Sequence, residues 1–148
     1  MNQNRTGMGD QQMRDRGKEP LVVDIDCLAR RNQNYRMALW TGTYLQITLM
    51  CIPEGGDIGL EMHSDVDQMI YVVEGNALVK MGKCKDAQPK GKTAGSGCAI
   101  VIPACTWHNV INTGNEPLKL YSVYAPPQHP FGTVHKTKQA AAEAERWE

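Results

Sequence analysis

Long apolar runs and an excess of one charge are both missing from this sequence. No stretch approaches the roughly 20 apolar residues of a membrane-spanning helix, so we expect no membrane association. The 148 residues include 16 basic and 16 acidic ones, and neither sign is concentrated enough to attract nucleic acid. The polar first 20 residues lack the apolar core of a secretion signal, which favours a cytoplasmic protein. A small molecule is therefore the expected partner.

Cysteine and histidine are few and scattered. The five cysteines never form a C-x-x-C pair, which fits neither a thiolate zinc knuckle nor a disulfide framework. We expect them to be reduced and buried, as free cysteines usually are. Only four histidines occur, at positions 63, 108, 129 and 135, so the position of each is informative.

The pattern of apolar residues predicts one domain with three segments. Residues 1–20 are too polar to offset the entropy of ordering them, so a flexible tail is expected. Residues 21–136 show short apolar or alternating blocks between turn residues, which predicts an all-β, antiparallel sandwich or barrel. The Ala- and Glu-rich residues 137–148 favour a short or frayed helix. The clearest expected strands are Tyr44–Ile52, Gln68–Val73, Ala77–Met81, Ala99–Ile102 and Leu118–Tyr124.

Four polar residues are placed to share one site. Glu61 and His63 are two residues apart in an extended stretch, so their side chains point to the same side. Gln68 begins the next expected strand after a short polar turn, and His108 begins another after the turn that starts at Pro103. Imidazole, carboxylate and amide oxygen all serve as metal ligands. Glu61 and His63 are therefore a natural pair of metal ligands, and Gln68 begins its strand close to them.

Two motifs in the chain resemble those of the cupin superfamily, and the resemblance covers roughly residues 44–124. The motif positions are occupied, with the usual spacings, by Gly55, Glu61, His63, Gln68 and Gly75 in the first motif and by Gly97, Pro103, Cys105, His108 and Asn112 in the second. Three residues depart from the usual types. Glu61 stands where the family usually has histidine, Gln68 where it has glutamate, and Cys105 where it has glycine.

The resemblance implies a fold, a cofactor and an assembly. The fold is an antiparallel double-stranded β-helix, the jelly-roll barrel of a small single-domain cupin, here followed by a short C-terminal helix. The cofactor is a metal ion held by Glu61, His63, Gln68 and His108, with coordination positions open at the barrel mouth. The assembly is a homodimer formed through sheet edges. Uncharacterised cupins described as similar to mannose-6-phosphate isomerase resemble more of the chain.

The altered ligand set keeps the charge of the usual one, since Glu61 supplies a single negative charge and Gln68 would coordinate through its neutral amide oxygen. One oxygen ligand in place of nitrogen lowers affinity and shifts preference toward harder ions, so Zn, Mn, Fe and Ni all remain open. The alternative is a metal-free interior in which Glu61 and Gln68 bond to each other or to a buried water. A buried carboxylate beside two imidazoles favours the cation.

Three functions fit such a site. The first is a metal-dependent isomerase or lyase acting on a small sugar-like molecule or a hydroxy- or oxo-acid. The metal is then a Lewis acid, and Glu61 is a ligand that also serves as base. The second is a metal-dependent dioxygenase, for which two histidines and one carboxylate suffice. The third is a non-catalytic cupin that binds or senses a small ligand, because the fold alone does not choose among functions.

Two further groups of residues are expected at the surface. The proline-rich segment 125–136 cannot continue a central strand. This segment could fold over the barrel as a lid or form a surface tail in which His129 and His135 are solvated. We expect the tail. The arginines near the start of the barrel, Arg36 among them, fit an anion site but are expected to be solvated.

Overall fold

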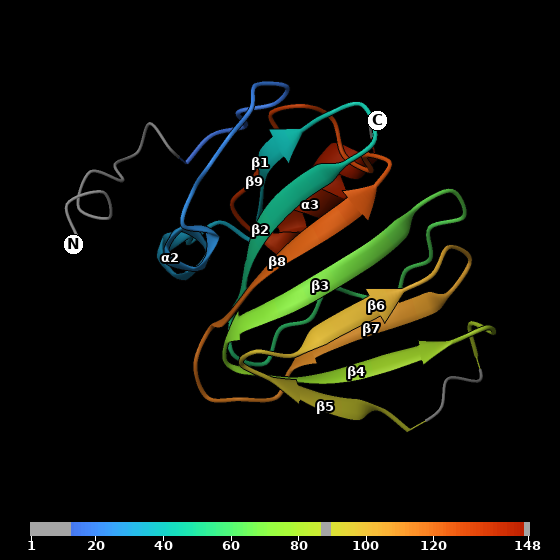
Figure 1. Ribbon diagram of the computed structural model, residues 1–148. Helices are drawn as coiled ribbons and strands as arrows, with labels where there is room; N and C mark the ends of the chain where they lie inside the picture. The colour runs from blue at the N-terminus through green and yellow to red at the C-terminus, as the bar shows by residue number, and fades with distance from the viewer. Residues whose placement is uncertain (1–12, 87–89, 147–148) are drawn as a thin grey trace.

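The computed structural model describes residues 13–86 and 90–146, which form two antiparallel sheets and two helices (Figure 1). In chain order the described elements are α2 (Ile25–Arg31), β1 (Arg36–Thr41), β2 (Gln46–Ile52), β3 (Asp67–Glu74), β4 (Asn76–Gly82), β5 (Lys92–Gly95), β6 (Ala99–Ile102), β7 (Trp107–Asn112), β8 (Leu118–Ala125), β9 (Val134–His135) and α3 (Lys138–Glu145). Strands β6, β3, β8, β2, β1 and β9 form a six-stranded sheet in that order, and β5, β4 and β7 form a three-stranded sheet. The expected all-β fold is confirmed.

The barrel interior is filled from alternate positions of the strands. Val72 on β3 and Met50 on β2 both lie opposite Leu120 on β8, and the three side chains are shielded from solvent. Burying each of them stabilises the fold by roughly 1.5–3 kcal/mol. Further along β8 the inward positions are Ser122 and Tyr124, so the interior becomes polar toward the end of that strand.

Helix α2 packs against the outer face of the six-stranded sheet. Asp24 caps its N-terminus, because the carboxylate accepts a hydrogen bond from the Cys27 backbone amide at 3.0 Å. Leu28 and Ala29 are buried against Leu49 of β2 in a second apolar cluster. This helix was not expected, since seven residues are too few to show a helical apolar pattern.

Residues 13–20 are held against the sheet. Asp15 is only 8% exposed, and its carboxylate accepts hydrogen bonds from the Thr41 hydroxyl and the Gly132 backbone amide. A carboxylate bonded in this way anchors a segment that has little apolar surface of its own. The prediction of a flexible tail is therefore wrong for this part of the chain, and residues 1–12 lie outside the described residues.

The proline-rich segment after β8 returns to the barrel. The side-chain amide of Gln46 on β2 binds the backbone of His129 in this segment. Its Oε1 accepts from the His129 amide at 2.9 Å, and its Nε2 donates to the His129 carbonyl at 2.8 Å. Strand β9 then pairs with β1. The expectation that His129 and His135 are solvated is wrong, because they are 9% and 6% exposed.

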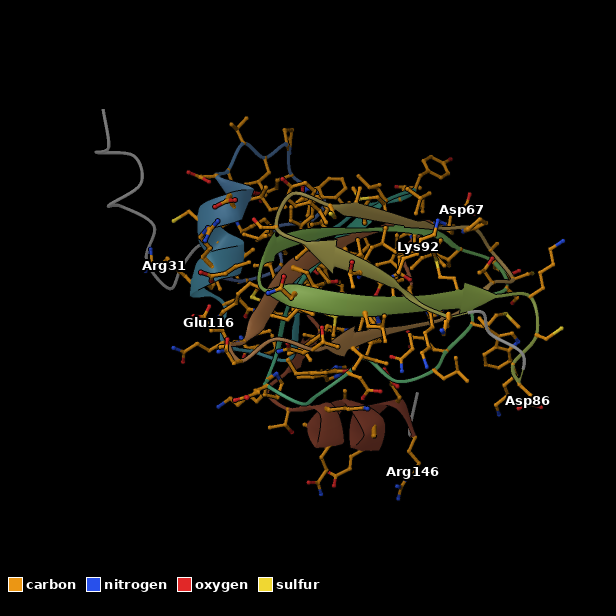
Figure 2. The ribbon with its side chains drawn as sticks, turned by 90° about the horizontal axis from the view of Figure 1, so that it is seen from below. Arg31, Asp67, Asp86, Lys92, Glu116 and Arg146 are labelled. Atoms are coloured by element: carbon orange, nitrogen blue, oxygen red, sulfur yellow. The ribbon has the colours of Figure 1, made fainter. Side chains whose placement is uncertain are left out.

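Helix α3 is the expected short C-terminal helix, and it packs on the interior side of the barrel. The Thr137 hydroxyl caps it by accepting from the Ala140 amide at 3.0 Å, and Ala141 is buried in the interior cluster. Figure 2 labels Arg31 at the end of α2 and Arg146 just after α3, and shows the two helices on different sides of the strands. No helix in the described part of the chain is long and apolar enough to cross a bilayer.

The five cysteines are free, but they are not buried as expected. Cys84, Cys98 and Cys105 are exposed, and Cys27 and Cys51 are half-buried. Cys51 lies on β2, Cys27 lies on α2 at the margin of the second apolar cluster, and the other three lie in turns, so sulfur contributes little to the core.

Candidate metal centre

The backbone brings Glu61 and His108 face to face. The two residues form an isolated antiparallel bridge, in which the Glu61 amide donates to the His108 carbonyl at 3.0 Å and the His108 amide donates to the Glu61 carbonyl at 2.9 Å. Residues that oppose each other in this way place their side chains on the same face. His63 lies two residues beyond Glu61 and therefore shares that side, as the sequence predicted.

The turn before β7 is tied to His63. The Cys105 amide donates to the His63 carbonyl at 2.8 Å. Cys105 has a φ of 65°, in the left-handed region that favours glycine. The turn thus keeps the shape that glycine usually gives it, although a side chain in this conformation costs roughly 1–2 kcal/mol.

The side chains of Glu61, His63 and His108 converge. The two imidazole Nε2 atoms each lie 3.4 Å from Oε1 of Glu61, and one ligand atom from each residue lies within 4.8 Å of the others. The His108 side chain is 1% exposed and that of Glu61 30%, so the group is buried on one side and open on the other. The structure brings together three of the four predicted site residues as a possible metal site.

The proton of the neutral His108 ring is on Nδ1. This atom lies 2.9 Å from the Thr106 carbonyl oxygen, which can only accept, so Nδ1 is the donor. In this neutral form Nε2 has a lone pair free for a cation, whereas a ring that carries protons on both nitrogens donates from Nε2 to Glu61. Within the described residues, Nε2 of His108 and Nε2 of His63 are both buried without a hydrogen-bond partner. Two buried ring nitrogens beside a carboxylate oxygen are a place for a cation.

Glu61 is ionised in this site. Burial alone would raise the pKa of its carboxyl group, but hydrogen bonds that the rings of His108 and His63 donate to it when no cation is bound, together with the positive charge of Arg36, lower that pKa to about 2. At neutral pH Glu61 therefore offers a charged oxygen, as a metal ligand must. The same low pKa makes Glu61 a weak base, which favours the ligand role over the base role also expected of it.

Gln68 faces the same interior from β3. Its side chain is buried, and Nε2 donates to the Ser122 hydroxyl at 3.3 Å. Its Oε1 is buried and has no hydrogen-bond partner among residues 13–86 and 90–146. In the sheet register Gln68 lies opposite Tyr124, whose ring is edge-on to His63 at a centroid distance of 6.1 Å. The amide oxygen is therefore available as a further ligand.

Arg36 and His129 also line the interior. The solvated interpretation of Arg36 is wrong, because its side chain is 3% exposed. Burial and the positive charge of Arg36 lower the pKa of His129 to about 3, so that its ring is neutral at physiological pH. Nε2 of His129 lies 3.4 Å from the Tyr124 hydroxyl. Sequence reasoning missed both residues as members of the site.

Comparison with known proteins gives one family. The sequence model of the cupin domain family matches residues 48–124 of this chain. The uncharacterized protein YrkC of Bacillus subtilis is 54% identical over 133 residues, which cover 90% of this chain and 72% of that protein. An uncharacterized protein of Acanthamoeba polyphaga mimivirus is 39% identical over 114 residues, which cover 76% of this chain and 69% of that protein.

Solved structures agree with the fold. BH2720 from Bacillus halodurans has a TM-score of 0.87 and 55% sequence identity, and the match covers 88% of this chain and 98% of that chain. An RmlC-like cupin family protein with a double-stranded β-helix fold, from Methanocaldococcus jannaschii, has a TM-score of 0.56 at 14% identity, covering 66% of this chain and 84% of that chain. The second likeness is one of fold alone.

Proposed function

Because the chain belongs to the cupin family, we propose that it holds one divalent transition metal ion at Glu61, His63 and His108 and acts through it on a small polar molecule. Gln68 is the proposed fourth and weakest ligand, since a neutral amide oxygen attracts a cation less than a carboxylate does. Zn, Mn, Fe and Ni all suit a site of two imidazoles and oxygen ligands.

One observation carries the proposal. The lone pair of His108 Nε2 faces the charged Oε1 of Glu61 at 3.4 Å, and Nε2 of His63 lies at the same distance from that oxygen. At this separation each ring nitrogen must either share a proton with the carboxylate or share a cation with it. A divalent ion satisfies all three ligand atoms at once.

The chain's own residues set what such a site does. A divalent ion bound there supplies Lewis acidity, which lowers the pKa of an α-proton or hydroxyl of a chelating hydroxy- or oxo-compound. Glu61 remains an anionic ligand, and the Thr106 carbonyl keeps His108 in the ligating tautomer. The buried ring of Tyr124 and the neutral ring of His129 help to exclude water from this side of the site.

A dioxygenase is the second candidate, and a specific observation favours it. The converging group consists of two histidines and one carboxylate, the ligand set of many non-haem iron oxygenases. If Gln68 does not coordinate, more positions stay open for substrate and oxygen. A non-catalytic cupin that only binds a small ligand is the third alternative.

Proton exchange separates these functions. The metal-loaded protein is incubated in D₂O with lactate, pyruvate and glyceraldehyde, and NMR follows deuterium at the carbon next to the carboxylate, ketone or aldehyde group, with and without oxygen. Lewis-acid chemistry predicts oxygen-independent exchange that is lost in Glu61→Ala and His108→Ala. Oxygen consumption without anaerobic exchange supports the dioxygenase. Retained metal with neither activity contradicts an enzyme acting on these compounds and supports a binding protein.

A further inference from the structure

Arg36 is a buried cation inside the barrel. In the sheet register it lies opposite Met50 and His135, so its side chain points inward with that of Met50. The guanidinium lies over the Tyr35 ring, 5.3 Å from the ring centroid. Arginine is rarely buried unless it is paired with an anion, so this side chain requires an explanation.

Glu145 is the ion-pair partner of Arg36, and it satisfies only part of the guanidinium's hydrogen-bonding capacity. Nη1 contacts Oε1 of Glu145 at 3.3 Å, and the Glu145 side chain is 48% exposed at the end of α3. Within the described part of the chain, Nε of Arg36 is buried and has no hydrogen-bond partner. Guanidinium groups bind carboxylates best through two parallel hydrogen bonds. Glu145 supplies one long contact and leaves donor capacity unused.

A cavity of about 80 Å³ lies between Arg36, Glu61 and Glu145, with α3 as one wall. This volume holds roughly five water-sized atoms at about 15 Å³ each. An adjoining cavity of about 390 Å³ shares Tyr35 and Lys138 with it. Asp57, Lys136 and Lys138 line the larger cavity, and because Asp57 pairs with Lys138, the positive charge of Lys136 is left to favour anions there.

The charges of the site also favour an anion. A divalent ion ligated by Glu61 leaves one positive charge uncompensated, and Arg36 adds a second. His129 is neutral because of its low pKa, and Asp57, the other carboxylate near this cavity, is paired with Lys138. The half-exposed Glu145 alone does not balance this interior.

We infer that the ligand of this protein is a small hydroxy- or oxo-acid whose carboxylate binds the Arg36 guanidinium in the cavity beside Glu61. The inference rests on the proposed function and narrows it, because it favours acids over neutral sugars. Glu145 is the internal substitute for the ligand's carboxylate and gives way when the acid binds. The cavity volume suits acids of two or three carbons.

Calorimetric titration of the full-length protein with glycolate and its uncharged analogue glycolamide tests this inference. Wild type is expected to bind glycolate at least tenfold more tightly than glycolamide, since one charged bidentate pair is worth that ratio. Arg36→Gln removes the preference, and Arg36→Lys keeps a weaker one. Glu145→Gln tightens glycolate binding severalfold because it removes the internal competitor. Glu143→Gln, an exposed change on the same helix, leaves affinity unchanged.

Several outcomes overturn the inference. Equal affinities of wild type for glycolate and glycolamide would do so. Equal effects of Glu145→Gln and Glu143→Gln on glycolate affinity would also do so. This comparison of the two glutamate variants remains decisive if Arg36→Gln fails to fold. Metal content is measured on the same samples. A metal-free wild type that still prefers glycolate overturns the proposed function and leaves the Arg36 site standing. A metal-loaded wild type without that preference overturns the Arg36 site alone.

Discussion

Gln68 is the neutral member of the proposed ligand set, and Gln68→Glu gives this position the charge it usually has in the first cupin motif. A second anionic ligand attracts a divalent ion more strongly, so we expect metal affinity to rise at least tenfold. Competition with a chromogenic chelator measures the change. Gln33→Glu adds the same charge at an exposed position and serves as control. Unchanged affinity in Gln68→Glu would argue that Gln68 does not reach the ion.

His129 makes stability depend on pH. Burial and the positive charge of Arg36 lower its pKa to about 3, against an opposing effect of Glu61, while His63 and His135 also face it. The unfolded chain takes up a proton below about pH 6.5 that the folded chain does not, so stability falls as pH drops through this window. For one proton the loss is about 1.4 kcal/mol per pH unit.

Urea unfolding of metal-free protein at pH 7 and pH 5 measures this loss. Glu61 stays ionised in the folded and unfolded chains over most of that interval, because its pKa of about 2 lies below its ordinary value of 4.5. His129→Gln is expected to show a smaller difference between the two pH values than wild type. The same difference in both proteins would contradict the assignment to His129.

Residue pattern predicted part of the site and missed the rest for a physical reason. Glu61, His63 and His108 could be grouped because strand alternation and motif spacing are local signals. Arg36 and His129 are buried by contacts with residues far away in sequence, such as Glu145 and Gln46. The only local hint was the anion-binding interpretation of the arginines, and charge alone favours solvent.

Helix α3 depends on its cap as well as on its packing. Thr137→Ala removes the hydrogen bond to the Ala140 amide and should destabilise the helix by about 1 kcal/mol. Amide hydrogen exchange is expected to speed up in α3 while the exchange of the strands stays the same. Thr43→Ala, in an exposed loop, is the matched control. Unchanged exchange in α3 would show that packing of Ala141 alone holds the helix.

Elements were predictable where the local pattern was long enough. The expected strand Ala99–Ile102 is β6 itself, and Leu118–Tyr124 is β8 without its last residue. Helix α2 and strand β9 were missed because seven and two residues give no clear period. The Asp24 cap was the one available signal for α2, but N-cap residues also occur in many turns.

The whole molecule is expected to be a homodimer, which remains a prediction. Val101 lies on β6, an edge strand of the six-stranded sheet, and is 67% exposed. An exposed apolar edge of this kind favours pairing with a second copy. Light scattering after gel filtration should give about twice the chain mass of 16.4 kDa. Val101→Lys is expected to lower this mass, whereas Val22→Lys, at a fully exposed position outside the strands, is not. A monomeric wild type would contradict the prediction.

The central claim is that the chain holds one divalent metal ion at Glu61, His63 and His108, and elemental analysis of protein purified without a metal-affinity tag tests it most directly. We expect about one transition metal ion per chain in wild type and in Glu54→Ala, which removes an exposed carboxylate from the turn after β2. Glu61→Ala and His108→Ala should retain less than about a tenth of that amount. A wild type as free of metal as these two variants would contradict the claim.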